Sequence, residues 1–258
     1  MKKSYTTEAI NLKNYPLNDN DSIVVMFSRS KGLISAVARG AKSPKSKLGA
    51  RIQMFIANSI MLFEGKNLDT ISQAQSLNTF SKIRYDLNKL SYSMYIAEIV
   101  NTFCSKQYNK DENSSVIYDL IFDSYNKIAN SSNVDEILLT VLKFQLQIMN
   151  ILGWGLDFLT CTTCQKELES DIYYSKSYNG FLCKNCALES GQYVKINHKV
   201  KEFLYDLSKT QISEKTKYDE LVNYSFLDKC FQFMKKYIEN ISHKKTKVFE
   251  VMDNIRNI

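Results

Sequence analysis

The stretch at residues 22–40, SIVVMFSRSKGLISAVARG, decides the fold of the N-terminal third of this chain. Its first six residues, Ser22 to Phe27, are mostly apolar and β-branched or aromatic, which favours a buried strand. Ser30-Lys31-Gly32 is a turn sequence, and a second strand-like pattern continues from Leu33 to Gly40. The stretch therefore predicts two strands joined by a short turn.

Further strand-like runs lie on both sides of this pair. Residues 8–13 alternate apolar and polar side chains, residues 54–63 form an apolar run, and residues 68–74 suit a fifth strand. Five short strands with a long loop between the third and the fourth are typical of a small OB-type barrel. Barrels of this type commonly bind nucleic acid.

After residue 80 the apolar period changes from two to about 3.6 residues, which predicts helices. The first two apolar faces are Leu90, Met94, Ala97, Val100 with Cys104, and Val116, Ile117, Leu120, Ile121 with Ile128. Asn133 and Glu136 form a capping-box pattern before a third face at 134–152, which Gly153 is placed to end. Helices are also expected at 200–207, 218–241 and 247–255.

Four of the six cysteines form two CxxC pairs, Cys161 with Cys164 and Cys183 with Cys186. Pairs at this separation predict one zinc ion held by four thiolates, and two disulfides are the alternative interpretation. Four cysteines leave no open coordination position, so we expect a structural ion. Cys104 and Cys230 lie in apolar, helix-like surroundings and are expected in the core.

We therefore expect an α+β protein with three parts. The predicted parts are a five-stranded OB-type domain at 1–80, a mostly helical domain at 81–156 and 190–258, and a small zinc-ribbon-like insert at 157–189.

The positive charge of the chain is concentrated in one window. No acidic residue occurs between Asp21 and Glu64, whereas the whole chain carries a net charge of +7. Such a local excess suits a polyanion-binding face, whereas a basic stretch taken alone is more often a solvated surface; its position among the strands of an OB-type barrel favours the binding face. The cations of the window are Arg29, Lys31, Arg39, Lys42, Lys45, Lys47 and Arg51.

Two smaller groups of residues bear on binding. A second basic cluster could extend a DNA path, receive an acidic peptide or balance a helix dipole; it consists of Lys235, Lys236, Lys244, Lys245 and Lys247. Phe27, Phe55 and Tyr15 are aromatic candidates for base stacking, but a core position is favoured for each of them, since the strand alternation points Phe27 inward.

The sequence offers no pattern for catalysis. It lacks a phosphate-binding GxxxxGK[ST] loop, HExxH and GxSxG, and it contains two histidines. We therefore expect a protein that is not an enzyme. A nuclease using an acquired metal is the alternative. The N-terminus lacks a signal-peptide pattern and no apolar run is long enough to span a membrane, so we expect a cytoplasmic protein.

Residues 31–46, KGLISAVARGAKSPKS, resemble the N-terminal signature of the bacterial RecO recombination mediator family. In that family an aliphatic strand leads into a basic Ala-Arg-Gly-Ala loop, and residues 52–55 are similar to its next strand. The two CxxC pairs occupy the position of the zinc motif found in many members.

The resemblance implies a role in DNA repair and homologous recombination, in the cytoplasm at the bacterial nucleoid. It implies binding of single- and double-stranded DNA without sequence specificity, annealing of complementary strands, and assistance in loading RecA on coated single strands. Implied partners are RecR and the acidic tail of single-strand-binding protein. An RNA-binding or ribosome-associated protein remains the alternative, because OB barrels and zinc ribbons also occur there.

Overall fold

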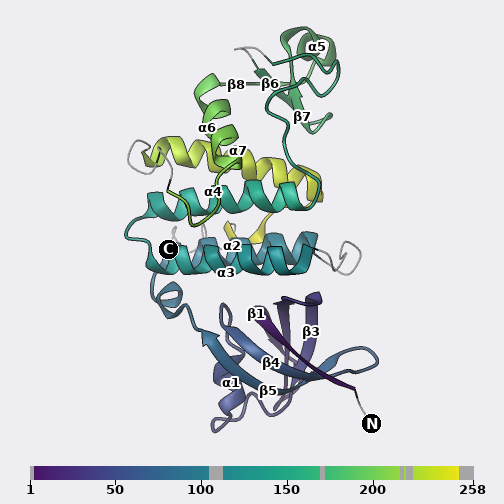
Figure 1. Cartoon of the computed structure of the whole chain (residues 1–258), viewed down its shortest axis with the longest axis vertical. Helices are drawn as coiled ribbons and strands as arrows, with labels where there is room; N and C mark the ends of the chain where they lie inside the picture. Colours follow the sequence, from purple (N-terminus) through teal and green to yellow (C-terminus); the bar gives the residue numbers. More distant parts are fainter. Residues whose placement is uncertain (1–2, 105–112, 169–171, 216–217, 219–222, 250–258) are drawn as a thin grey trace. The chain divides into compact units, whose positions relative to one another are not determined.

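The protein is described from a computed structural model, which covers residues 3–104, 113–168, 172–215, 218 and 223–249. The fold is mixed α+β, as the sequence predicts, with a five-stranded barrel followed by helices (Figure 1). The chain divides into two compact units. One consists of Met1–Ser131 with Lys247–Ile258, and the other of Ser132–Thr246.

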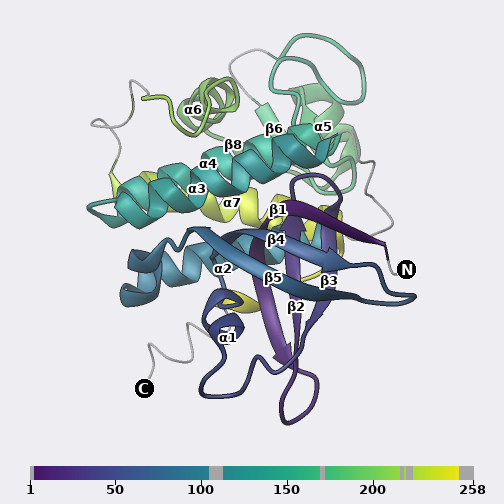
Figure 2. The same cartoon turned by 60° about the horizontal axis from the view of Figure 1, so that its bottom comes forward.

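The barrel of the first unit closes in the strand order β1-β2-β3-β5-β4. Its strands are β1 (Ser4–Pro16), β2 (Ser22–Ser28), β3 (Gly32–Ala38), β4 (Ala57–Phe63) and β5 (Asp69–Asn78). The pairing of β3 with β5 is parallel and the other pairs are antiparallel (Figure 2).

Strand β1 is longer than the predicted strand at residues 8–13 because it pairs with two neighbouring strands. Residues 4–10 pair with β4, and residues 9–16 pair with β2, with an irregularity between Asn11 and Lys13. A single long strand that bends at a bulge thus closes the sheet into a barrel.

Small side chains fill the inside of the barrel. Ala9, Ala36, Ala38 and Ala74 are each at most 4 % exposed. They pack in one cluster with larger residues such as Met26. A five-stranded barrel is narrow, so alternating small and large side chains allow it to close without voids.

Two strand predictions need correction. Residues 52–55, expected to open a strand, form turns instead, and β4 begins only at Ala57. Phe55 has a positive φ of 67°, which no strand allows, and its ring packs edge-on to Tyr125. The fifth strand runs from Asp69 to Asn78, beyond the predicted end at residue 74.

Four helical elements complete the first unit among its described residues: α1 (Lys47–Arg51), η1 (Ser81–Tyr85), α2 (Leu87–Phe103) and α3 (Ser114–Asn130). Helix α3 contacts β1, β2 and β3 of the barrel. Val116, which the periodicity assigned to the apolar face, is 51 % exposed, so that assignment was wrong. Cys104 and Cys230 are buried, as expected.

In the second unit α4 (Val134–Ile151) begins and ends as the sequence predicts. The Asn133 side chain accepts a hydrogen bond from Glu136 N at 3.0 Å, while the Glu136 carboxylate accepts one from Ser132 N at 2.7 Å. Gly153, with φ of 81°, follows the helix. The bonds from its N–H and from Trp154 N–H to Asn150 O and Met149 O form a Schellman motif.

The remaining elements of the second unit surround the cysteines and α4. They are β6 (Ile172–Ser175), β7 (Gly180–Leu182), α5 (Lys184–Ser190), β8 (Val194–Ile196), α6 (His198–Ser208) and α7 (Tyr224–Ser242). The strands form one antiparallel sheet in the order β7-β6-β8, and α4 contacts both α6 and α7. The expected terminal helix lies outside the described residues beyond residue 249.

Candidate nucleic-acid interface and metal centre

The acid-free window folds into β2, β3, β4 and the loop between β3 and β4. That loop contains the short helix α1 (Lys47–Arg51), which contacts β5 (Figure 2). Five residues cannot hold a helix by themselves, because the first turn costs more conformational entropy than one hydrogen bond returns. The neighbouring barrel residues must therefore keep this helix in place.

Two buried asparagines hold the end of α1 against the barrel. Asn11 Nδ2 donates to Arg51 O at 2.8 Å and to Gln53 O at 2.9 Å. Asn58 Nδ2 also donates to Arg51 O, at 3.0 Å. Both asparagine residues are 1 % exposed, and Ser46 caps the start of the helix through Gly49 N–H. The basic loop is thus fixed by polar contacts that originate in the barrel.

The first part of the loop is tied to the turn before β2. The Asp21 carboxylate accepts from Gly40 N–H at 2.8 Å, and Lys42 N–H donates to Asn20 O at 3.0 Å. The pKa of Asp21 lies below its ordinary value because of the Gly40 N–H, the Asn18 side chain and the charge of Arg39. The acidic residue that precedes the window therefore positions its basic turn.

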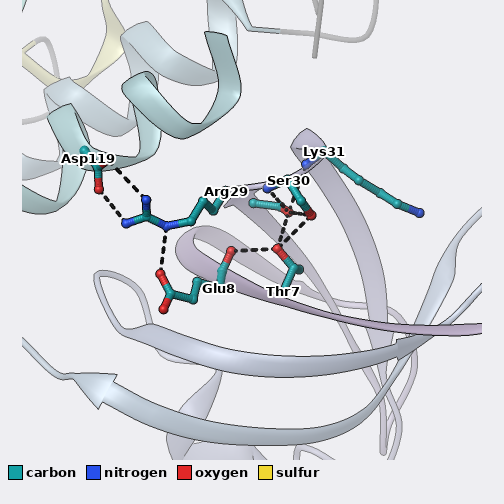
Figure 3. A network of polar contacts seen from close by, with 7 residues as sticks. Thr7, Glu8, Arg29, Ser30, Lys31 and Asp119 are labelled. Atoms are coloured by element: carbon teal, nitrogen blue, oxygen red, sulfur yellow. Dashed lines mark hydrogen bonds and ion pairs between the residues drawn. The ribbon is translucent and has the colours of Figure 1, made fainter. Parts of the chain in front are cut away.

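The seven cations of the window have different environments. Arg29 Nε donates to Glu8 at 2.8 Å, and its two terminal nitrogens bind Asp119 at 3.1 and 2.5 Å (Figure 3). Its guanidinium also lies over the Tyr118 ring, 4.4 Å from the centroid. Two carboxylates thus flank the Arg29 guanidinium, and these contacts connect β1, the β2–β3 turn and α3.

Two further cations of the window also bind protein groups. Lys31 Nζ lies 3.1 Å from the Glu64 carboxylate and 3.5 Å from the centre of the Tyr5 ring. Arg51 donates to the carbonyl of Ala74 in β5.

The other four cations lie on the loop after β3 and are exposed: Arg39, Lys42, Lys45 and Lys47. We call this set the loop cations. Lys42 Nζ donates to Asn18 O at 3.0 Å. In the part of the chain that the structure describes, no ion pair involves any of the four. Their charges are therefore available to an anionic ligand.

Two grooves lie beside α1. One, of about 640 Å³, is lined by Tyr15, Lys42 and Gln53 among others, and the other, of about 620 Å³, by Lys47, Arg51 and polar residues of β4 and β5. Of the three aromatic candidates, Phe27 and Phe55 are buried and Tyr15 is 37 % exposed. Only Tyr15, of these three, offers a ring to a ligand without a rearrangement of the barrel.

The four CxxC cysteines come together in the second unit. Cys161 and Cys164 lie in a tight turn closed by bonds from Cys161 N to Lys166 O and from Gln165 N to Cys161 O. Cys183 precedes α5 and Cys186 lies in its first turn. Thr162 N donates to Phe181 O in β7 at 2.9 Å, which joins the two pairs.

The geometry of the sulfurs fits a tetrahedral ion. All four Sγ atoms lie within 4.8 Å of one another, and those of Cys164 and Cys183 are 3.8 Å apart. Zn–S bonds of about 2.3 Å place tetrahedral sulfurs about 3.8 Å apart, whereas a disulfide requires about 2.05 Å. Burial raises the pKa of the Cys161 thiol, but N–H groups of Cys164, Cys183 and Thr163 outweigh this effect and lower it, whereas burial and the neighbouring sulfurs raise the pKa of Cys186. The N–H groups of the two turns thus favour a first thiolate at Cys161. Thiolate is the form that binds a metal.

The lysines of the second basic cluster have different environments. Lys235 is paired with Glu239 at 2.9 Å, whereas Lys236, Lys244 and Lys245 are exposed and line one groove. Lys247 belongs to the unit of the barrel, where its N–H donates to Glu98 at 2.9 Å.

Comparisons with known proteins cover almost the whole chain. Residues 1–80 match the family model described as Recombination protein O N terminal, and residues 84–247 match Recombination protein O C terminal. A protein named DNA repair protein RecO from Desulforamulus reducens is 29% identical over 255 residues, covering 98% of this chain and 95% of that protein. Proteins of the same name from Clostridium perfringens and Caldanaerobacter subterraneus are 28% and 30% identical, covering 95% and 80% of this chain and 96% and 80% of their own lengths.

Proposed function

Because the chain belongs to the recombination protein O family, we propose that it acts in DNA repair and recombination by binding single- and double-stranded DNA without sequence specificity. The observation that carries this proposal is the set of loop cations, which are exposed and form no ion pair with a described residue. We assign DNA binding to residues 1–80. The helical segments 81–156 and 190–258 and the insert 157–189 form the rest of the chain, and we propose that they carry further binding surfaces.

The chemistry of the loop suits a phosphate backbone. Lysine and arginine side chains neutralise phosphates and displace the counterions condensed on DNA, and this contact carries no sequence information. Tyr15 lies in the same groove as Lys42, so one base can stack on its ring while the lysine binds the adjacent phosphate. Arg29 is assigned a structural role, because two carboxylates already compensate its charge.

The more specific activities that we propose all require a protein that binds a DNA strand without recognising its sequence. We propose that the protein is a mediator and not an enzyme, that it anneals complementary strands, and that it helps load RecA on strands coated by single-strand-binding protein. Its proposed partners are RecR and the acidic tail of that coating protein, at the bacterial nucleoid. Among the described residues, no helix is both long enough and apolar enough to cross a bilayer.

We propose that Cys161, Cys164, Cys183 and Cys186 hold one zinc ion with a structural role. Zinc bound by four thiolates has no open position for a substrate, so its contribution is the free energy that it adds to the folded insert. The sulfur geometry supports this assignment.

Fluorescence anisotropy with a labelled single strand tests the binding proposal. Replacing Lys42, Lys45 and Lys47 with alanine should weaken binding to any sequence, because each lysine binds one phosphate. Lys66→Ala is the matched control, an exposed lysine on the β4–β5 turn outside both grooves. Equal affinity of the triple variant and the control would refute the loop as the DNA face, and a strong preference for RNA of equal length would favour an RNA-binding function.

Strand annealing tests the mediator proposal. Complementary strands coated with single-strand-binding protein should anneal faster in the presence of the protein, and RecR should change that rate. Cleavage of labelled DNA with Mg²⁺ or Mn²⁺ would contradict a purely non-enzymatic role.

A further inference from the structure

The second unit contains a groove of about 1210 Å³ that the proposed function does not yet use. Its walls come from the β6 and β8 strands, the start of α6, and α7 with the residues that follow it. All lining residues belong to one compact unit, so the groove is independent of how the two units are placed. We call it the α7 groove.

The α7 groove is strongly basic. Six of its lining residues are lysines: Lys176, Lys195, Lys229, Lys236, Lys244 and Lys245. The lining also includes two carboxylates, those of Asp228 and Glu239. Glu239 accepts bonds from Thr246 N and Oγ1 and pairs with Lys235, so its charge is already compensated. The groove therefore presents a clear excess of positive charge.

Aromatic rings accompany the lysines and are held in fixed orientations. Tyr193 is 40 % exposed, and its ring meets Tyr173 edge-on, with centroids 5.1 Å apart. Phe233 stacks on Phe181 at an interplanar angle of 15° and meets the Tyr174 ring edge-on at 5.2 Å. Both Tyr193 and Phe233 line the groove.

Polar side chains complete this lining. Tyr174 is 9 % exposed and lies at the inner side of the groove. The amides of Gln192 and Gln232 also line the groove and offer both donors and acceptors.

We propose that the α7 groove is a second binding site for single-stranded nucleic acid. The lysines bind phosphates, Tyr193 and Phe233 provide ring faces for bases, and the glutamine amides contact base edges. Flat rings beside a row of lysines match a strand of alternating bases and phosphates. The proposal rests on the proposed function, since a protein that anneals two strands requires a place for each.

Photo-crosslinking and stoichiometry test the proposal on the full chain. The probe is a thymidine strand of about ten nucleotides that carries a photoreactive thymine, short enough for one site. At low salt we expect two strands per chain and crosslinks within residues 191–197 as well as in the barrel domain. Replacing Lys236, Lys244 and Lys245 with alanine should remove the second strand and flatten the salt slope by about 2, at about 0.7 per lysine.

Tyr193→Ala tests how much ring stacking contributes to binding, separately from the charge of the lysines. It should weaken binding at the second site roughly 5- to 150-fold, the range for loss of one stacking ring. Tyr178→Ala and Lys199→Ala are the matched controls, since both residues are exposed in the same unit and lie outside the groove. Both controls should bind like the unmodified protein.

The variants also separate this proposal from the barrel assignment. A triple variant in the barrel loop should keep the crosslink at 191–197 and lose the one in the barrel. One strand per chain with no crosslink at 191–197 would overturn the second site and leave the barrel assignment intact. If the groove variants bind DNA normally but lose an aspartate-rich peptide, the groove binds acidic peptides and the proposal is wrong.

Discussion

Arg29→Ala separates cations that hold the fold from cations that bind DNA. Arg29 lies within the basic window, yet its guanidinium binds Glu8 and Asp119 and covers the ring of Tyr118. We predict that its loss lowers stability and leaves DNA affinity nearly unchanged. Lys45→Ala should weaken DNA binding and leave stability nearly unchanged, because Lys45 is exposed on the loop.

The magnitude follows from the exposure of the partners. The side chains of Arg29, Glu8 and Asp119 are 39%, 44% and 54% exposed, so solvent screens each pair. Exposed ion pairs contribute about 0.2–1 kcal/mol each and an exposed cation–π contact about 0.5–1 kcal/mol. Because these terms share one side chain, we expect a total loss of about 1–2 kcal/mol, which lowers Tm by about 2–8 °C.

Thermal unfolding and anisotropy should be measured on the same samples of Arg29→Ala, Lys45→Ala and Asp119→Ala. The double variant Arg29→Ala/Asp119→Ala should be less destabilised than the sum of its single variants, since both remove one interaction. Raising the salt concentration should reduce the effect of Arg29→Ala on Tm. If Arg29→Ala keeps the Tm of the unmodified protein and weakens DNA binding as much as Lys45→Ala, the structural role of Arg29 is refuted.

Three further predictions follow from buried polar contacts and the cysteine cluster. Asn11→Leu should destabilise the first unit by about 1–3 kcal/mol in urea unfolding, because the Gln53 carbonyl loses its buried donor while the Arg51 carbonyl keeps only Asn58, and an unchanged midpoint would contradict the role of Asn11 in holding α1. Metal analysis should find about one zinc ion per chain. Adding a chelator or introducing Cys183→Ser should make the insert sensitive to protease while the barrel stays folded. A metal-free chain whose insert is still protected from protease would exclude zinc as the ion that stabilises the insert. Burial raises the pKa of Glu239, but its hydrogen bonds to Thr246 and its pairing with Lys235 outweigh this effect, so the pKa in the folded protein is lowered. The ionised Glu239 therefore stabilises the folded protein fully above the unfolded-state pKa of about 4.3, and this stabilisation is lost as the pH falls through the lower pKa of the folded state. Unfolding measured between about pH 6 and 3 should show this acid-dependent loss, and a Glu239→Gln variant with the same loss would refute it.

The sequence predicted what depends on local pattern. The runs at 22–27 and 33–40 correspond to β2 and β3, although β3 ends at Ala38, and the capping residue Asn133 starts α4 as expected. The two CxxC pairs also meet in space, because each pair forms its own turn and the β6–β7 hairpin joins them.

What depends on distant partners was not visible in the sequence. Arg29 looked like the other cations of the window, because its partner Asp119 lies 90 positions away. Helix α1 has too few residues for a periodic signal and is held by Asn11 and Asn58, which read as ordinary polar strand residues. The α7 groove gathers lysines from 176 to 245, and only the folded chain brings them together.

The salt dependence of single-strand binding tests the central claim most directly. The claim is that exposed loop cations neutralise phosphates, so the slope of log K against log salt should be about −0.7 per phosphate contact. Removing Lys42, Lys45 and Lys47 together should flatten that slope by about 2, and Arg29→Ala should leave it unchanged. A triple variant with the slope of the unmodified protein would contradict the account, because the loop would then make no phosphate contact.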